Sequence, residues 1–308
     1  MLLSVVVTIV DGGPALERCL QALAGQHGAP AMEVLIPFDH SIVAARLPTD
    51  RFPHFAFLAL GRLPTRHPAM SALGQHELFD RRRAAGLAVA TGDLVAMLED
   101  RGVPRPDWAA AFVRLHATLP WAAIGGAIEN GVPRALNRAV YFCDFGRYQR
   151  PFHERVSSAA SDVNVCYKRA ALESVKRVWR DRYHEPVVHR ALTRAGQTVF
   201  LSPDPVVDQV RDDLRLGALC RERIAWGRLY AKLRLSGAPW FERVALVAAS
   251  PVLPLLLMFR IGRDRIVKRR DVMSFLAAAP SVLLLVCAWS VGEAAEYLVS
   301  LAGPARRA

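Results

Sequence analysis

The sequence predicts an α/β protein in which a doubly wound, mostly parallel sheet is followed by amphipathic and hydrophobic helices. Apolar runs of strand length alternate with helical patterns along most of the chain, as in proteins built on parallel sheets. One of these runs, residues 93–98, ends in two adjacent carboxylates, and residues 272–292 carry no charge at all. We therefore expect a sheet domain over residues 1–213 and a helical region over residues 214–308.

The predicted strands are short apolar runs bounded by polar or turn-forming residues. Residues 2–10 lack the basic start and the small-residue cleavage site of a signal peptide, so they fit a first buried strand. A nearly continuous apolar run is typical of a parallel strand that is covered on both faces. Further strands are expected at residues 32–38, 55–60, 93–98, 121–128 and 198–201, and Ser202-Pro203-Asp204-Pro205 is expected to form a turn.

Helices are predicted between these strands from the spacing of apolar side chains. Residues 14–24 place Leu16, Leu20 and Leu23 on one side of a helix. Pro186 suits the first turn of a helix over residues 186–195. Further helices are expected at residues 77–90, 106–119 and 214–235, the last of them basic and amphipathic.

The composition limits the class of protein. Of the 308 residues 52% are hydrophobic, and the mean hydropathy of +0.18 is high for a purely soluble protein. The five cysteines are odd in number and scattered, so neither a disulfide framework nor a paired-cysteine zinc site is expected. We therefore expect the sheet domain to work in a reducing, cytoplasmic setting.

Positive charge is concentrated late in the chain. The net charge is +12, and residues 211–270 carry 14 Lys or Arg against 5 Asp or Glu. Such a stretch favours an anionic partner, either nucleic acid or anionic lipid. No nucleic-acid-binding motif and no alternation of basic and aromatic residues accompanies it. We therefore predict that this region meets an anionic membrane surface, and we predict no nucleic-acid partner.

Two apolar segments point to the membrane. The segment of residues 272–292 is long enough to cross a bilayer. Lys268-Arg269-Arg270 lie directly before it, as basic residues do on the cytoplasmic side of membrane spans. Residues 244–259 are short for a span and contain Pro251 and Pro254, so we expect them to be re-entrant or to lie in the interface. The second segment then either spans or lies shallow, and a buried helical hairpin of a soluble protein is the remaining alternative. The predicted location is the cytoplasmic membrane, with the sheet domain facing the cytoplasm.

Two carboxylates end the strand at residues 93–98. Glu99 and Asp100 are followed by Gly102 and Pro104, which turn the chain. Ligands of open α/β sheets bind just beyond the carboxyl ends of the strands. Carboxylate oxygens suit Mg²⁺ or Mn²⁺, and these metals hold phosphates. The pattern predicts an enzyme that handles a diphosphate, although acids at strand ends also occur simply as capping or solubilising residues.

Several motifs follow one another in an order typical of one enzyme family. In chain order they are Asp11 after the first strand, Asp39 and Ser41 after the second, Arg83 and Gly86 in a helix, Glu99-Asp100-Arg101, and Glu185 eleven residues before Gly196. Over residues 1–235 the chain resembles glycosyltransferase family 2, whose members have the GT-A fold. The resemblance implies an inverting enzyme that moves a sugar from a nucleotide-diphosphate sugar to a hydroxyl of a lipid-linked or cell-envelope acceptor.

The resemblance also implies roles for single residues. Glu185 inherits the role of the catalytic base, which takes the proton of the acceptor hydroxyl. Asp162 and Asn164 resemble the segment that lines the acceptor side. The residues expected at the nucleotide sugar are Asp11, Asp39, Ser41, Arg83, Glu99, Asp100 and Arg101. The segment from Trp289 to Tyr297 resembles the hydrophobic end of membrane-associated bacterial members.

A divalent cation, Mn²⁺ or Mg²⁺ held by Asp100, is the cofactor that the resemblance implies. The family's metal motif has acids at both ends, whereas its last position here is Arg101, and Gln209 stands where relatives often have a histidine. Two alternatives follow. Either Glu99 and Asp100 bind the metal with altered geometry, or Arg101 itself neutralises the diphosphate. We therefore expect metal binding to be weaker than usual or dispensable.

Other interpretations of the same residues stay open. Arg101 and Gln209 also fit a glycosyltransferase-like protein that is inactive or only weakly active and binds a sugar donor or a partner, and the basic tail also fits a membrane scaffold. His184 and His189 invite a zinc-protease interpretation, which fails because the two histidines are five residues apart rather than four. We expect Arg81 and Arg82 to be solvated. Four aromatic side chains fit either the core or an acceptor groove: Tyr141, Phe142, Phe145 and Tyr148.

Overall fold

Two units make up the chain in the computed structural model, which describes residues 2–43, 47–212, 214–235 and 238–302. The sheet unit comprises Met1–Met70, Gly74–Gly131 and Tyr148–Arg211, and the helical unit comprises Ser71–Leu73, Val132–Arg147 and Asp212–Ala308. Residues 132–147, which the sequence places inside the sheet domain, therefore group with the C-terminal helices.

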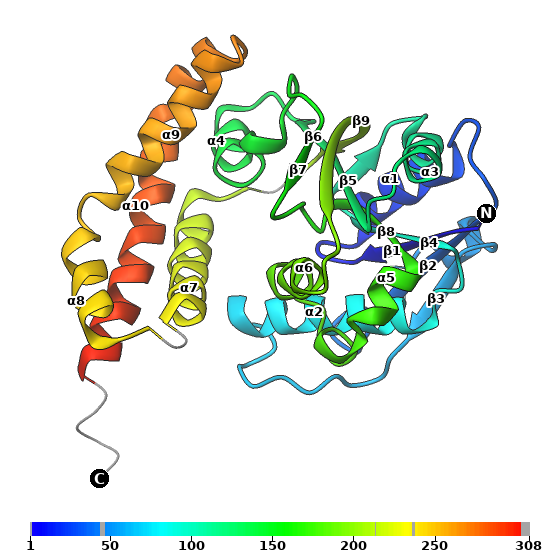
Figure 1. Ribbon diagram of the computed structural model, residues 1–308, viewed down its shortest axis with the longest axis horizontal. Helices are drawn as coiled ribbons and strands as arrows, with labels where there is room; N and C mark the ends of the chain where they lie inside the picture. The colour runs from blue at the N-terminus through cyan, green and yellow to red at the C-terminus, as the bar shows by residue number, and fades with distance from the viewer. Residues whose placement is uncertain (1, 44–46, 213, 236–237, 303–308) are drawn as a thin grey trace. The chain divides into compact units, whose positions relative to one another are not determined.

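One mixed sheet forms the centre of the sheet unit (Figure 1). Its strands are β1 (Leu3–Thr8), β2 (Met32–Phe38), β3 (Ala56–Ala59), β4 (Leu94–Glu99), β5 (Gly102–Pro104), β6 (Ala123–Asn130), β7 (Arg155–Ser157), β8 (Asn164–Lys168) and β9 (Val199–Gln209). They lie in the order β3-β2-β1-β4-β8-β6-β9-β5, and β7 pairs with β9. Among the described residues, six of these strands run in one direction, because only β5, β7 and β8 pair antiparallel to their neighbours. The predicted α/β fold with a mostly parallel sheet is confirmed.

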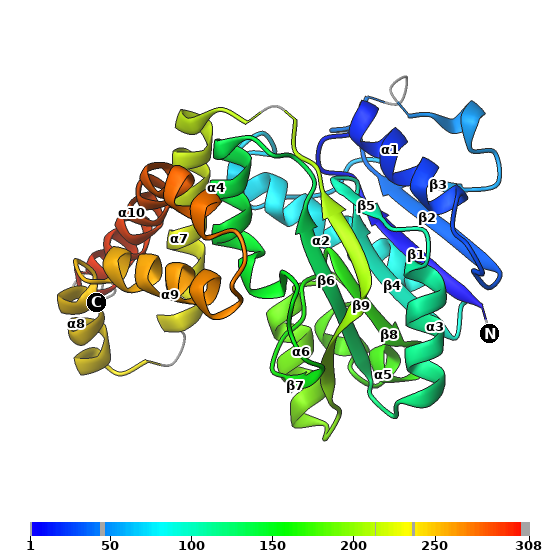
Figure 2. The same cartoon turned by 90° about the horizontal axis from the view of Figure 1, so that it is seen from above.

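Helices cover both faces of this sheet. They are α1 (Gly13–Ala24), α2 (Ala72–Val89), α3 (Trp108–Thr118), α5 (Arg169–Ser174) and α6 (Glu185–Arg194). Figures 1 and 2 show α1 and α3 on one face and α2, α5 and α6 on the other. Leu16, Leu20 and Leu23 of α1 are buried in one core cluster with Val5 and Val7 of β1, as the helical spacing predicts. Because both faces are covered, every residue of β1 is buried.

Two predicted element boundaries in the sheet unit are wrong. The turn predicted at residues 202–205 lies inside β9, because the pairing with β6 shifts there: Gly125 pairs with Leu201 and Ala127 with Val206, so the intervening residues form a bulge. Helix α2 begins at Ala72 rather than at residue 77. Strand β8, which lies between β4 and β6 at the centre of the sheet, was not predicted.

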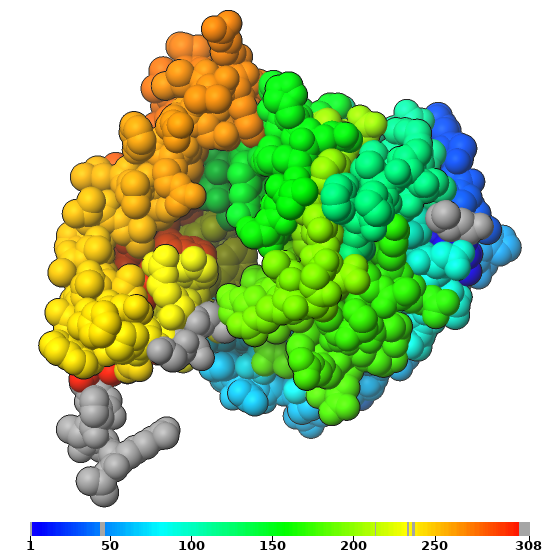
Figure 3. Space-filling view, viewed as in Figure 1, coloured from blue at the N-terminus to red at the C-terminus, as the bar shows by residue number. Residues whose placement is uncertain are grey.

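The helical unit contains α4 (Ala135–Asp144), α7 (Leu216–Leu235), α8 (Trp240–Ala249), α9 (Leu253–Val267) and α10 (Val272–Ala302). Helices α7 and α10 cross at two glycines. A Cβ on Gly227 would lie 2.3 Å from the carbonyl oxygen of Trp289, and a Cβ on Gly292 would lie 2.2 Å from that of Ile224. Only a residue without a side chain lets the two backbones approach so closely. Figure 3 shows α8 and α9, yellow to orange, covering much of α10 in that view.

Charged side chains are buried between these helices. Glu293 and Glu296 of α10 are 3% and 7% exposed. Glu293 accepts a hydrogen bond from Tyr297 and lies 3.7 Å from Arg234 of α7, and Glu296 accepts one from Arg228 at 3.1 Å. These contacts bind the C-terminal half of α10 to the most basic helix of the unit.

Apolar side chains, in contrast, remain exposed. The stretch Val272–Leu301 of α10 is long and apolar enough to cross a membrane, and 22% of its most apolar window is buried. Helices α8 and α9 pass the same test together, but they are bent by 69° at the break between them. Residues 244–259, which the sequence predicts to be re-entrant or interfacial, cover the end of α8 and the start of α9, and the chain breaks between these helices next to Pro251 and Pro254.

Candidate functional site

The candidate site lies where parallel strands end. Strands β1, β2 and β4 are neighbours that run in the same direction, so the segments that follow them meet at one edge of the sheet. Thr8 at the end of β1 pairs with Glu99 at the end of β4. Ligands of open α/β sheets bind at such an edge.

Asp100 holds the loop that follows β1. One carboxylate oxygen accepts the N–H of Val10 at 3.0 Å, and the other accepts those of Asp11 at 3.0 Å and Gly12 at 2.6 Å. Its side chain is buried, and burial raises its pKa to about 6 despite the hydrogen bond from Gly12. Both oxygens therefore accept hydrogen bonds from the backbone of this loop.

Arg101 and Asp11 form a forked ion pair at the same edge. The guanidinium donates two hydrogen bonds to the carboxylate, at 2.6 and 2.7 Å. Burial opposes ionisation of Asp11, but the hydrogen bond and charge of Arg101 keep its pKa below the usual value. The Arg101 and Asp11 side chains are 17% and 40% exposed, so this cation is accessible from solvent.

Asp39 and Ser41 lie at the end of β2 and are held by Arg82. The Asp39 carboxylate accepts hydrogen bonds from Arg82 Nε and from the N–H of Ser41, both at 2.7 Å. Arg82 also donates to the Ser41 hydroxyl and to the carbonyl of Ile9, each at 2.7 Å. Arg82 is fully buried, so its predicted position on a solvated helix face is wrong. It is a residue of the site that the sequence analysis missed.

Arg83 gathers carboxylates from three segments. Its Nη2 atom lies 2.8 Å from Glu99 and 3.0 Å from Asp162, and its Nη1 atom lies 3.9 Å from Asp80. Burial raises the pKa of Glu99 despite the charge of Arg83. Arg83 itself stays charged, because the three carboxylates outweigh the effect of its burial and raise its pKa.

Glu185 begins helix α6 beside this cluster. Its Oε2 atom accepts the N–H of Asp162 at 3.1 Å, and its Oε1 atom lies 3.7 Å from Nδ1 of His189. His189 Nε2 is 2.6 Å from the Tyr167 hydroxyl, which is 2.6 Å from that of Tyr183. His189 and both tyrosines are buried. Through Asp162 and Arg83, Glu185 belongs to one contact network with Glu99.

Asn164 is the predicted site residue that lies apart. It is fully buried, and its amide nitrogen donates to the carbonyls of Ala127 at 2.7 Å and Pro205 at 3.0 Å. Its oxygen accepts a hydrogen bond from the Trp108 indole at 2.8 Å. The side chain thus joins β6, β9 and α3 inside the sheet unit, and we leave it out of the acceptor site. Three of the four aromatic residues that fit either core or groove are likewise buried: Tyr141, Phe142 and Tyr148.

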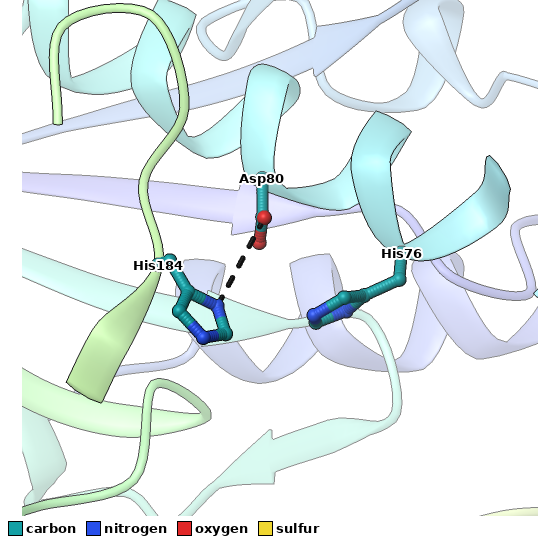
Figure 4. Close-up of side chains that lie close together, drawn as sticks. All are labelled: His76, Asp80 and His184. Carbon is teal, nitrogen blue, oxygen red and sulfur yellow. Dashed lines mark ion pairs between the residues drawn. The ribbon is translucent and has the colours of Figure 1, made fainter. Parts of the chain in front are cut away.

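A second polar cluster was missed entirely by the sequence analysis. His76 and Asp80 of α2 and His184 just before α6 point toward one another (Figure 4). One ligand atom of each residue lies within 4.8 Å of the other two. Burial lowers the pKa of His76 and so favours its neutral form, despite the nearby Asp80.

The Glu99-Asp100-Arg101 motif does not fit the divalent cation that the resemblance implies at Asp100. Both oxygens of Asp100 already accept backbone hydrogen bonds, and Glu99 is paired with Arg83. Arg101 adds a positive charge where a metal ligand would be needed. The amide of Gln209, which pairs with Gly102 across β5 and β9, is buried without a hydrogen-bond partner among the described residues.

Comparisons with known proteins concern the fold. No family model and no curated protein matches the sequence. The mannosyltransferase PcManGT from Pyrobaculum calidifontis, solved with GDP-Man and Mn²⁺, aligns with a TM-score of 0.52 and 17% identity over 97% of this chain and 87% of its own. The fold is glycosyltransferase-like. A second structure, TarS from S. aureus, aligns with a TM-score of 0.47 and 13% identity over 98% of this chain and 90% of its own.

Proposed function

We propose that this chain is an inverting glycosyltransferase. It moves a sugar from a nucleotide-diphosphate sugar to a hydroxyl of a lipid-linked or cell-envelope acceptor at the cytoplasmic face of the membrane. The observation that carries the proposal is the network Glu185–Asp162–Arg83–Glu99, because it joins a carboxylate suited to be a base to the strand edge that also bears Arg101. The matched mannosyltransferase, solved with GDP-Man, supports the class of donor.

Glu185 is the proposed base. Its carboxylate takes the proton of the acceptor hydroxyl while that oxygen forms a bond to the anomeric carbon of the donor sugar. The bond from the anomeric carbon to the diphosphate oxygen breaks on the opposite side, so the configuration inverts. Asp162, by its backbone N–H, and His189 hold the carboxylate in place from two sides. We therefore retain Asp162 as a residue of the acceptor side of the site.

Arg101 is the proposed counter-charge for the departing diphosphate. A guanidinium binds phosphate oxygens through two parallel hydrogen bonds, which is the geometry that Arg101 already uses with Asp11. The diphosphate competes with Asp11 for this fork. Asp39 and Ser41, which follow β2 at the same edge of the sheet, are the proposed contacts of the nucleoside. Of the two alternatives left by the sequence, the geometry supports Arg101, and no step is assigned to a cation at Asp100.

The helical unit is the proposed membrane anchor. Large apolar side chains are exposed along α8, α9 and α10, and basic residues surround them. A charged side chain at the centre of a bilayer costs about 3 kcal/mol. Glu293 and Glu296 bind α10 to the basic helix α7, so we propose that α10 lies in the membrane interface instead of crossing it.

A topology reporter tests this orientation. In intact cells, a phosphatase active only outside the cytoplasm is fused after the last residue of the full chain. With α8 and α9 re-entrant or in the interface, an α10 in the interface leaves the reporter inactive, and a crossing α10 makes it active. The same reporter fused to a protein with one known span is the positive control.

Nucleotide binding and turnover test the function. Isothermal titration with UDP and with GDP, each with and without Mn²⁺, is expected to show binding to one of them without metal. Release of nucleoside diphosphate from a panel of sugar donors is expected for the native chain and is lost in Glu185→Gln. Binding without release would favour an inactive binding protein, and the absence of any binding would favour a membrane scaffold.

A further inference from the structure

A carboxylate and two imidazoles converge outside the residues assigned to sugar transfer. His76 and Asp80 are four residues apart on α2, so they share one face of that helix. His184 comes from the segment that precedes α6, and Figure 4 shows its ring beside that of His76, with Asp80 above them. The two rings meet edge to face, with centroids 5.6 Å apart.

Polar atoms of this cluster lack the partners that buried groups normally have. Asp80 is 2% exposed, and its Oδ1 atom accepts no hydrogen bond among the described residues. The Nε2 atom of His184 is likewise buried and without a partner in that part of the chain. A buried polar atom without a partner is costly, and a bound water or ion is one of the explanations for such an atom in a native protein.

We propose that His76, Asp80 and His184 form a binding site for a divalent transition-metal ion of the Zn²⁺ class. Two imidazoles and one carboxylate suit such ions, whereas Mg²⁺ prefers oxygen ligands alone. Three protein ligands leave a fourth position for water, as in open zinc sites. The proposal does not rest on the transfer reaction.

The distances allow this coordination after small side-chain rotations. The ligand atoms lie within 4.8 Å of one another. A tetrahedral ion with bonds near 2.1 Å needs them about 3.4 Å apart. No hydrogen bond among the described residues holds Nε2 of the His184 ring, and Nδ1 of that ring lies 4.0 Å from Oδ2 of Asp80.

Neighbouring arginines do not exclude a cation. Arg182 donates to Oδ2 of Asp80 at 3.0 Å, whereas Nη1 of Arg83 lies 3.9 Å from Oδ1, too far for a hydrogen bond. The Arg182 side chain is 34% exposed, so water screens its charge. Arg83 is paired with Glu99 and Asp162 as well as with Asp80, so the carboxylates around the cluster outnumber the guanidinium groups.

The site has a structural consequence. His184 directly precedes Glu185, and its metal partners lie on α2. A bound ion would tie the start of α6 to α2 and so restrict the position of the Glu185 carboxylate. We assign the ion this positioning role alone.

Cobalt binding tests the site. The full chain, purified in detergent without a polyhistidine tag and stripped with a chelator, is titrated with Co²⁺, whose visible absorption reports a four-coordinate site. We expect one Co²⁺ per chain, displaced by Zn²⁺. His76→Ala and His184→Ala should each weaken binding by more than about tenfold, since losing even an outer-shell partner costs about 10- to 100-fold.

The matched control is His54→Ala, because His54 is exposed and lies outside the cluster. It should bind Co²⁺ as the native chain does. Circular dichroism and titration with UDP or GDP show whether each variant is folded. If His184→Ala is not folded, the Co²⁺ affinity of His76→Gln is compared with that of the control instead. Absence of saturable binding to the native chain, or equal affinity in folded cluster variants and control, overturns the proposal.

Discussion

The two units of this chain place charged and apolar side chains in opposite ways. In the sheet unit, apolar residues of α1, α3 and the strands form a buried cluster, and charged groups meet at the edge where parallel strands end. In the helical unit, Glu293, Glu296 and Arg265 are buried between helices while large apolar residues such as Leu255 and Phe259 are 67% and 66% exposed.

The difference supports the proposal that the two units face different solvents. Charged groups at the sheet edge cluster around solvent-accessible Arg101, which suits a polar ligand delivered through water. Exposed apolar surface on α8–α10 is unfavourable in water at about 25 cal/mol per Å², and a large patch of it marks a membrane or protein contact. Each unit can therefore be disrupted separately, and variants in one should leave the function of the other intact.

The largest expected effect comes from the base in the sheet unit. Glu185→Gln removes the proton acceptor and should reduce sugar transfer by about 10²- to 10⁴-fold. Donor affinity and membrane binding should not change, because Arg101 and the helical unit are untouched. Rates of nucleoside diphosphate release measure the effect. Glu173→Gln, an exposed residue of α5, is the control, and equal rates in the two variants would remove Glu185 from the mechanism.

The next effect belongs to the helical unit. Leu255 and Phe259 are four residues apart on α9, and burying each side chain in lipid is worth about 1.5–3 kcal/mol. The double variant Leu255→Asp/Phe259→Asp should therefore bind anionic vesicles at least about 100-fold more weakly, as measured by flotation.

Exposed apolar residues of the sheet unit provide the matched control. Met70 and Val156 are 85% and 61% exposed, so the change Met70→Asp/Val156→Asp has the same chemistry in the other unit. It should leave vesicle binding unaltered. Equal loss in both double variants would mean that the proposed division between the units is wrong.

A smaller effect is expected at the diphosphate. Arg101→Ala removes charge-assisted hydrogen bonds worth about 1.5–3 kcal/mol, so UDP or GDP should bind about 10- to 100-fold more weakly. Arg105→Ala is the control, because Arg105 makes the same forked pair with Asp208 at 2.9 Å. Calorimetry with and without Mn²⁺ measures both. A native chain that binds nucleotide only with Mn²⁺ would contradict the role of Arg101.

The strands with both faces covered could be predicted from the sequence. A central strand with polar ends could not, and neither could the buried face of a helix whose buried residues are charged. Strands β1 and β4 are nearly continuous apolar runs, so their pattern identifies them. Strand β8 begins at buried Asn164 and ends at Lys168, and its polar ends hide a central strand. The buried face of α2 carries Glu77, Asp80, Arg82 and Arg83, so no apolar stripe marks it.

The same reasoning explains which site residues were found. Residues directly after apolar strands, such as Asp39 and Asp100, follow from the strand pattern and the family resemblance. Arg82 looks like any member of a basic run until its partner Asp39 is placed beside it by the fold. His184 meets His76 only through the packing of the segment before α6 on α2, which no local spacing encodes.

The smallest effect is a pH dependence confined to the sheet unit. His116 of α3 is buried with Nε2 3.1 Å from the carbonyl of Cys166, and burial lowers its pKa to about 4 despite that hydrogen bond. Its unfolded pKa is about 6.5, so the unfolded chain gains a proton first as the pH falls. The stability that neutral His116 contributes is complete above about pH 6.5 and is lost progressively between about pH 6.5 and 4. At pH 5 this loss amounts to about 2 kcal/mol.

His116→Gln keeps a donor for the carbonyl but cannot be protonated, so it should flatten this part of the stability profile. Hydrogen exchange followed by mass spectrometry at pH 7 and pH 5 measures each unit separately. Peptides from α3 and β8 of the native chain should lose protection at pH 5, and those of the variant should lose less. Peptides from α7 and α10 should respond equally in both proteins, and His54→Gln should behave as the native chain. A profile that stays equally steep in His116→Gln would show that other groups govern the acid sensitivity of the sheet unit.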